Sequence, residues 1–224
     1  MTNPPSVTGN RITVRPPSGW PTLGLYDLWR YRDLLWILAL RDIQVKYKQT
    51  VLGVGWVILQ PLATAAVFTI VFGRFLNLPS DGTPYLLFSF TGVVLWTYFA
   101  TALTTCSNSL VGNAGLIGKV YFPRLVIPLS AILAAGADML VGLGVLAALM
   151  AWYGTAPDWM AVIAVPLLVV LSGLIALGVG LWLSALNVMY RDVRYAIPFL
   201  IQFWMFATPI VYPLSAVPEQ YRLV

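Results

Sequence analysis

The sequence predicts an all-α integral membrane protein, with an N-terminal amphipathic helix at the membrane interface and five transmembrane helices after it. Two observations predict this fold. Of the 224 residues, 59% are hydrophobic and only 9% are charged, whereas a soluble domain carries about 25% charged residues. The charges also stand between long uncharged segments, and a bilayer-spanning helix needs about 20 mostly apolar residues. A chain with so little charge needs lipid around it.

The N-terminal residues divide into two segments. Residues 1–24 are polar and rich in Pro, Ser, Thr and Gly, so we expect a flexible cytoplasmic arm. In residues 25–48, basic and aromatic residues flank an apolar stretch at 34–40 that is too short to cross a bilayer. This composition is typical of a helix lying in the membrane interface.

Residues 49–224 form the predicted transmembrane domain. Its uncharged stretches place the spans near 53–73, 85–110, 125–152, 159–187 and 195–212. Eleven Lys and Arg fall on one side of these spans, and only Arg74 and Arg222 fall on the other. The positive-inside rule therefore puts the N-terminus in the cytoplasm. The proline-rich segment after the fifth span is expected to be an extracytoplasmic loop or re-entrant segment, and the chain is expected to stop before a further span.

The composition also excludes several classes of function. The chain has no His, which removes the usual proton shuttle and the commonest metal ligand. Cys106 is its single cysteine, so neither an intramolecular disulfide nor a cysteine-rich metal site is expected. No Walker A, GxSxG or HExxH pattern is present, so we expect no catalytic residue, and another chain must bind any ATP. The basic residues are not clustered on a soluble domain, so no nucleic-acid partner is expected.

The connection between the second and third spans reads SNSLVGNAGLIGKVYFPRLVIPL. It predicts a short helix followed by a turn, with prolines around the start of the third span. Exposed Tyr121 and Phe122 at this turn would form a contact surface for another protein. The alternative is an interfacial loop anchored by its aromatic residues.

Three stretches together carry a resemblance to a known family. They are RDIQVKYKQTVLGVGWVILQPL, NAGLIGKVYFPRLVIPL and ALNVMYRDVRYAIPFLIQFWMFATPIVYP. In this order they resemble the membrane subunit of bacterial type-2 ABC transporters that export polysaccharides and polyol phosphates, such as O-antigen, capsule and teichoic acid. Members of that family usually have six spans.

The resemblance implies a location and partners. The permease would lie in the bacterial cytoplasmic membrane as a homodimer, in contact with membrane lipid. Two copies of a separate ATPase subunit would bind ATP and Mg, and the permease itself would hold no cofactor. The substrate would be an undecaprenyl-type lipid-linked glycan.

The resemblance also assigns roles to residues. The N-terminal helix would be a gate at the cytoplasmic interface, with Trp29, Arg32, Trp36, Arg41, Lys46 and Lys48. The loop after the second span would be the coupling helix that binds the ATPase, through Asn113, Leu116, Ile117, Lys119, Phe122 and Pro123.

The first and fifth spans would line the channel. Gln60 and Pro61 are expected to break the first span locally, because Pro removes a backbone hydrogen bond; a packing kink is the alternative. Sugar rings can stack on aromatic side chains, although such residues also occur facing lipid. The channel-lining candidates are Gln60, Phe68, Phe72, Phe203, Trp204 and Phe206.

Two further features leave alternatives open. Asp138 lies within the third span, where an ionisable residue is a functional candidate by default, or else a hydrogen-bonded structural carboxyl. Arg191, Asp192 and Arg194 connect the last two spans. They would anchor the loop by the positive-inside rule, contact the ATPase, or bind the pyrophosphate of a lipid carrier through the arginine fork.

Three other functions compete with polysaccharide export. A permease of the same group could move a drug or a lipid. A membrane glycosyltransferase should carry acidic catalytic residues in its cytoplasmic loops. In this sequence the expected cytoplasmic loops after the first span contain only one acidic residue, Asp192. A secondary transporter would show paired broken spans with several buried polar groups.

Overall fold

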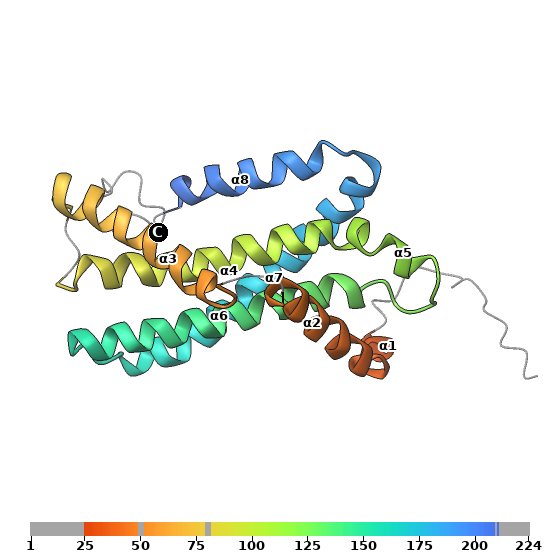
Figure 1. Cartoon of the computed structure of the whole chain (residues 1–224), viewed down its shortest axis with the longest axis horizontal. Helices are drawn as coiled ribbons and strands as arrows, with labels where there is room; N and C mark the ends of the chain where they lie inside the picture. Colours follow the sequence, from red (N-terminus) through yellow and green to blue (C-terminus); the bar gives the residue numbers. More distant parts are fainter. Residues whose placement is uncertain (1–24, 49–51, 79–81, 209, 211–224) are drawn as a thin grey trace, which may run out of the picture.

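The computed structural model describes residues 25–48, 52–78, 82–208 and 210, and within these ranges the regular elements are all helical. The helices α1 (Leu25–Arg30) and α2 (Arg32–Tyr47) come first, followed by α3 (Gly55–Phe68) and its π-helical continuation η1 (Thr69–Phe75). The long helices α4 (Tyr85–Gly112), α6 (Val126–Tyr153) and α7 (Trp159–Met189) run side by side in the bundle (Figure 1). The shorter helices are α5 (Ala114–Ile117) and α8 (Val193–Ala207).

Four helical segments of the described residues are long and apolar enough to cross a membrane: Gly55–Phe75, Tyr85–Gly112, Val126–Tyr153 and Trp159–Met189. They coincide within a few residues with the first four predicted spans. α8 has 15 residues, fewer than the roughly 20 that a span needs, so the fifth span remains a prediction. The expected arm at 1–24 and the segment from 211 onward lie outside the described residues.

Local sequence explains where several helices begin and end. Pro84, with an extended backbone, precedes α4, and extended Asp158 precedes α7. Gly154 ends α6 in the left-handed conformation at φ 66°, which glycine adopts without a steric penalty. The expected break at Gln60 and Pro61 is wrong, because α3 runs through Pro61 as an α-helix. Proline removes one backbone hydrogen bond, and such a loss is tolerated in membrane helices that pack against neighbouring helices. The backbone changes from α-helix to π-helix only at η1, which begins at Thr69.

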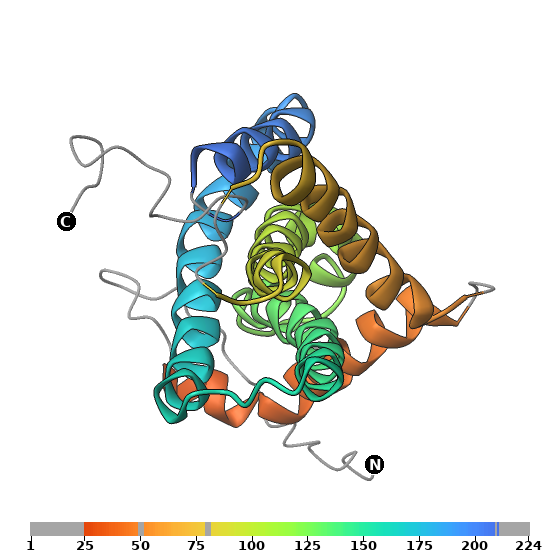
Figure 2. The ribbon, with the colours of Figure 1, turned by 90° about the vertical axis from the view of Figure 1, so that its left-hand side faces the viewer.

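α4 is the central helix of the bundle. Seen along the bundle, it lies in the middle, with α3, α6, α7 and α8 around it (Figure 2). Its buried side chains include Phe90, Leu103 and Cys106, which belong to the largest hydrophobic cluster of the described residues. The outward faces of the surrounding helices keep large apolar side chains exposed, such as Leu167 and Trp182 on α7. This distribution suits a lipid environment.

Small residues let α7 approach α4 closely. The buried residues of α7 are Gly173, Ala176, Gly180, Ser184 and Asn187, spaced three or four apart along one face. A Cβ added at Gly180 would lie 2.6 Å from the sulfur of Cys106 and 2.8 Å from its Cβ. Small residues are the usual means by which membrane helices pack tightly, so this stripe sets the spacing between α7 and α4.

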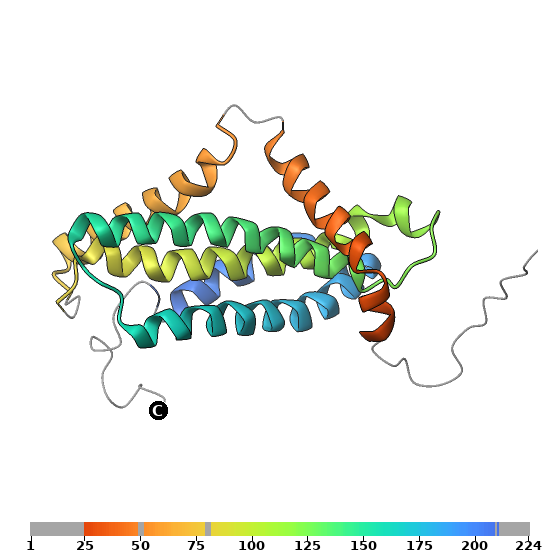
Figure 3. The same cartoon turned by 90° about the horizontal axis from the view of Figure 1, so that it is seen from below.

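One end of the bundle, here called the basic end, carries Lys119, Arg124, Arg191 and Arg194. α1, α5 and the connection from α7 to α8 gather there (Figure 1). α2 starts at this end and leans away from the bundle axis, and α3 leans back, so that the two helices form a V (Figure 3). α2 packs against α6.

Asp138 attaches α2 to the middle of α6. It is the thirteenth residue of the 28-residue α6, and its side chain is only 15% exposed. Lys46 forms an ion pair with it, and the Tyr47 hydroxyl donates a hydrogen bond to its other oxygen. A carboxylate in an apolar span needs such partners, so the structural interpretation of Asp138 fits this geometry, with α2 supplying the partners.

The stripe on α7 predicts the effect of adding a single methyl group. Gly180→Ala should destabilise the protein by about 1–3 kcal/mol through overpacking against Cys106. Gly178 is the matched control, because a Cβ there meets nothing within 4 Å and alanine favours the helix. Thermal unfolding of the purified variants in detergent measures both effects. Equal midpoints for the two variants would contradict the tight packing of α4 and α7.

The contacts of Asp138 with Lys46 and Tyr47 predict that removing its carboxylate loosens the end of α2. Asp138→Asn leaves the Lys46 ammonium without its carboxylate, and because Lys46 is half exposed the effect should be moderate. Amide hydrogens near residues 43–47 should exchange about tenfold faster. The control is Asp33→Asn, since that carboxylate is 89% exposed and pairs only with its neighbour Arg32 among the described residues. Identical exchange in both variants would show that Asp138 does not hold α2.

Candidate functional site

The expected gate helix and the expected coupling loop meet at the basic end in one hydrophobic cluster, here called the basic-end cluster. Its buried members are Leu38 of α2, Phe122 of the loop, and Val126 and Ile127 of α6. Half-buried side chains from α1, α2 and α5 pack around them: Leu28, Tyr31, Leu34, Leu35, Leu116 and Ile117. Because burial of apolar area is lost when such elements separate, the gate helix and the coupling loop should move together.

A hydrogen bond joins the same two segments. Arg41 on α2 donates to Oδ1 of Asn113 at 2.8 Å and also pairs with Asp42 at 2.7 Å. Asn113 is the residue between α4 and α5, and its amide nitrogen donates to the Ser109 carbonyl at 2.9 Å. Arg41 belongs to the expected gate helix and Asn113 to the expected coupling loop, and the fold brings the two residues into contact.

The expected coupling loop contains α5, a helix of four residues, followed by a turn, as predicted. One expectation about it is wrong: Phe122 is not an exposed contact residue, because it is 7% exposed inside the basic-end cluster. Pro123, the next residue, is half-buried. The exposed tip of the loop is instead formed by Lys119, Val120 and Tyr121, the last of these 76% exposed.

The remaining residues of the expected gate helix fall into two groups. Trp29 and Trp36 are largely exposed, and the Arg32 guanidinium lies 5.2 Å from the Trp29 ring. Lys46 pairs with Asp138, whereas Lys48 is exposed. Tyr47 was not singled out from the sequence. Burial, together with the hydrogen bond and charge of Asp138, raises the pKa of its phenol, so at neutral pH the phenol keeps the proton that it donates.

An open cavity of about 860 Å³ lies at the basic end between the two helix corners, α4–α5 and α7–α8. Arg191 and Arg194, singled out from the sequence, both line it, and Arg124 joins them from the loop before α6. Asp192, the residue before α8, is exposed and does not line the cavity. The walls are mostly apolar, with Leu110, Val111, Ile117 and Val188 among them.

Buried polar residues missed from the sequence stand beside this cavity. Asn187 of α7 is 4% exposed, and its amide nitrogen donates to the Ser107 carbonyl at 3.1 Å and to Oδ1 of Asn108 at 3.0 Å. These bonds tie the end of α7 to α4. An asparagine within a long apolar stretch was the available signal, since amides hydrogen-bond between membrane helices.

The six channel-lining candidates lie in different surroundings. Phe68 and Phe72 stack edge to face at 5.9 Å and pack with Val93, Met205 and Ile210, so both belong to the packing between helices. Gln60, Phe203 and Phe206 are exposed.

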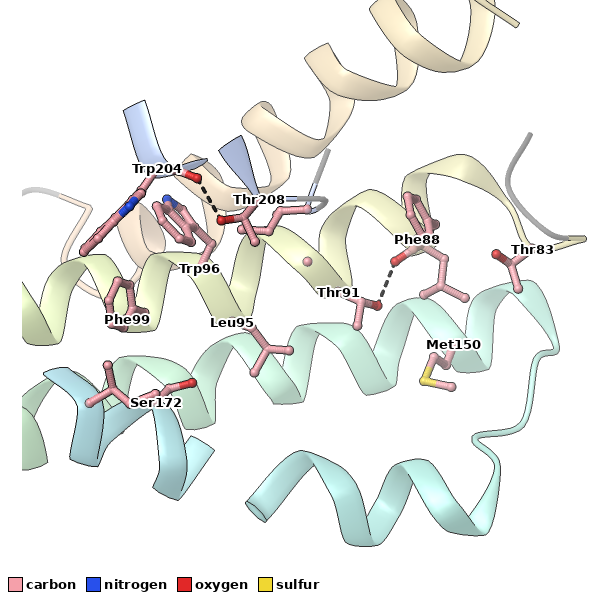
Figure 4. A pocket seen from close by; sticks show the side chains of 14 residues that line it. Thr83, Phe88, Thr91, Leu95, Trp96, Phe99, Met150, Ser172, Trp204 and Thr208 are labelled. Carbon is pink, nitrogen blue, oxygen red and sulfur yellow. Dashed lines mark hydrogen bonds between the residues drawn. The ribbon is translucent and has the colours of Figure 1, made fainter. Parts of the chain in front are cut away.

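Trp204 lines a second cavity of about 780 Å³ between α4, α6, α7 and α8, where it lies near Trp96 (Figure 4). The hydroxyls of Thr91 and Thr208 in its wall bond to carbonyls of their own helices. Among the described residues that line it none is charged, so these residues offer apolar and aromatic contacts. Within the described residues no cluster of His, Cys, Asp or Glu could hold a metal ion.

Comparison with known proteins assigns this architecture to a family. Residues 33–224 match the family model described as "ABC-2 type transporter". The chain is 31% identical over 199 residues to the O-antigen export system permease protein RfbA of Klebsiella pneumoniae, covering 89% of this chain and 76% of that protein.

Two further relatives are more distant. RfbA of Myxococcus xanthus, also named an O-antigen export system permease protein, is 29% identical over 194 residues, covering 87% of this chain and 74% of that protein. The polysialic acid transport protein KpsM of Escherichia coli is 24% identical over 188 residues, covering 82% and 71%. With the family model matching most of its length, this chain belongs to the ABC-2 type transporter family.

Proposed function

We propose that this chain is the membrane subunit of a bacterial exporter that moves a lipid-linked polysaccharide across the cytoplasmic membrane. The names of its relatives, which refer to O-antigen export and polysialic acid transport, support this substrate class. The carrier would be an undecaprenyl-type lipid. Two copies of the chain would form the pathway, and two copies of a separate ATPase would bind ATP and Mg.

The orientation follows from charge. The basic end faces the cytoplasm, together with the N-terminus, because the cytoplasmic loops of membrane proteins carry the excess of Lys and Arg. The far end carries Arg74 among the described residues. The ATPase would therefore meet the chain at the basic end, where α5 and its exposed tip project (Figure 1).

The basic-end cluster is the observation that carries the proposed mechanism. α5, Phe122 and the start of α6 share it with α2, and Arg41 bonds to Asn113 beside it. When ATP binding closes the ATPase dimer, displacement of the tip would be passed through these contacts to α2. α2 is also attached to α6 at Asp138, so it would pivot about that point and open or close the space beside α3.

The exposed tip predicts how the ATPase is held. A double variant Lys119→Ala and Tyr121→Ala removes an exposed cation and an exposed ring without touching the basic-end cluster. Truncating the few hot-spot residues of an interface weakens binding by about 2 kcal/mol or more, about thirtyfold, and we expect the exposed tip to contain such residues. When the chain is purified by affinity tag together with its partner ATPase, the amount of ATPase retained should fall by about that factor.

Tyr153→Ala is the matched control, because this ring is 41% exposed at the opposite end of the bundle. It should leave retention unchanged. The proposal is contradicted if the wild-type chain retains no ATPase, or if the tip variant retains as much ATPase as the control. Phe122→Ala is unsuitable for this test, because Phe122 is buried in the basic-end cluster.

A further inference from the structure

We infer that α2 covers a water-filled crevice that runs from the basic end to Asp138 in the middle of α6, and that ions in this water weaken the attachment of α2. The inference goes beyond the proposed function, because it requires neither the ATPase nor the exported glycan. It starts from a cavity of about 280 Å³ between α2, α4 and α6, here called the α2 crevice.

The lining of the α2 crevice is polar, although it lies among the long apolar helices. α2 contributes Asp42 and Lys46, and α6 contributes Asp138. α4 contributes three polar side chains that follow one another along one helical face: Thr101, Thr105 and Asn108. Hydrocarbon beside such groups would leave them without hydrogen-bond partners, which costs free energy, whereas water in a polar cavity satisfies them.

Small residues on α6 leave room for this water. The α6 wall is formed by Ala131, Ala134 and Ala135 together with Asp138, and methyl side chains do not fill the space between α6 and α2. A cavity of about 280 Å³ holds several water molecules, since each occupies about 30 Å³ in the liquid.

The hydrogen bonds of the lining residues also favour water. The Thr105 hydroxyl donates its one proton to the Thr101 carbonyl at 2.7 Å, and the amide nitrogen of Asn108 donates to the Thr104 carbonyl at 2.8 Å. The hydroxyl of Thr105, which is exposed, therefore offers only lone pairs to the crevice. The Asp138 carboxylate has room for further donors besides its two partners. The walls thus carry an excess of acceptors, and water supplies the donors.

The α2 crevice reaches the middle of the membrane. From Asn113 at its basic end to Thr101, α4 rises by roughly 18 Å, which is more than half of a hydrocarbon core of about 30 Å. A cavity of about 30 Å³ continues from Thr101 and Asp138, with Val57 and Pro61 of α3 in its wall. It has room for about one water molecule, so the polar passage narrows just beyond Asp138.

The α2 crevice is separate from the expected channel and from the exposed tip of the loop. The channel-lining candidates on α3 and α8 do not line it, and neither do Lys119, Val120 and Tyr121. It is a space between α2 and the bundle within one copy of the chain.

The position of the ion pair gives the crevice its consequence for α2. Lys46 and Asp138 both stand in its wall, so their pair lies against water. An ion pair is weaker in water than in an apolar medium, and dissolved salt screens it further. The attachment of α2 should therefore respond to ionic strength.

The first test detects water in the crevice by thiol labelling of the full chain, without ATPase, in nanodiscs of phosphatidylcholine. Thr101→Cys and Thr105→Cys should react with a cationic methanethiosulfonate reagent about tenfold faster than Leu140→Cys, because a thiol in water forms the reactive thiolate and a thiol in hydrocarbon does not. Leu140 is the matched control: it is 71% exposed and two residues after Asp138, but it does not line the crevice. The wild type gives the background, since Cys106 is buried.

The second test measures the attachment of α2 by amide hydrogen exchange in the same nanodiscs. Potassium chloride is raised from about 0.01 M to about 1 M, which shortens the Debye length from about 30 Å to about 3 Å. Amides near residues 43–47 of the wild type should then exchange about fivefold faster. In Asp138→Asn the exchange should be fast at both salt concentrations, because the ion pair is already lost. Amides near Gly180, in the tight packing of α7 on α4, are the internal control and should not change.

Two results would overturn the inference. If Thr101→Cys and Thr105→Cys, with the elution volume of the wild type, react no faster than Leu140→Cys, the crevice is dry. If salt leaves the exchange at 43–47 of the wild type unchanged, the ion pair lies out of reach of dissolved ions. Both tests use the chain alone, so either failure would leave the predicted retention of the ATPase untouched, and a chain that retains no ATPase could still have the crevice.

Discussion

A carboxylate in the middle of an apolar helix constrains this fold. Asp138 cannot remain unpaired in a bilayer without a large penalty, and Lys46 and Tyr47 at the end of α2 supply its partners. The end of α2 must therefore lie halfway along α6, and α3 must begin from there, which produces the V seen in Figure 3. The middle of α2 is held separately at the basic end, through Leu38 and Arg41.

The attachment of α2 at Asp138 and its attachment at the basic end differ in chemistry. This difference would allow α2 to pivot. The contact at Asp138 is a pair of directional bonds to one residue, which can persist while a helix rotates about it. The contact at the basic end is a hydrophobic cluster shared with α5 and Phe122, so it follows those elements when they move. Under the proposed function, a push on the tip at Lys119 to Tyr121 would become a swing of α2, while the tight packing of α4 and α7 at Gly180 keeps the bundle itself rigid.

Sequence reasoning predicted most of the helices. Hydrophobic stretches of about 20 residues indicate spans whatever their neighbours are, so α4, α6 and α7 were located within two or three residues. Local turn chemistry likewise indicated α5. The uncertain element was the fifth span, because its apolar stretch contains α8 and runs into residues that the structure does not describe.

Pairings between distant segments could not be predicted from one sequence. Arg41 and Asn113 are 72 positions apart, and no local sequence pattern predicts the hydrogen bond between them. Phe122 was expected to be exposed because aromatic residues in short loops often are, but the approach of α2 buries it. Arg191 and Arg194 were recognised as a basic loop, whereas the addition of Arg124 depends on how the helix corners meet. Tertiary packing decided each of these cases.

Under the proposed function, α2 swings with α5 about its attachment at Asp138. Electron spin resonance distances in the complex with the ATPase measure this movement. Labels at Ile37→Cys and Leu140→Cys, both exposed, report the distance from the middle of α2 to α6. Val45→Cys with Leu140→Cys reports the distance from the attached end of α2 to α6. Cys106 is buried and should not react with the label.

On ATP binding, we expect a changed distance for the pair at 37 and 140 and little change for the pair at 45 and 140. In Asn113→Ala the change should be smaller but not absent, because the hydrophobic cluster remains. Unchanged distances for both pairs in a complex that still hydrolyses ATP and exports glycan would contradict the swing of α2.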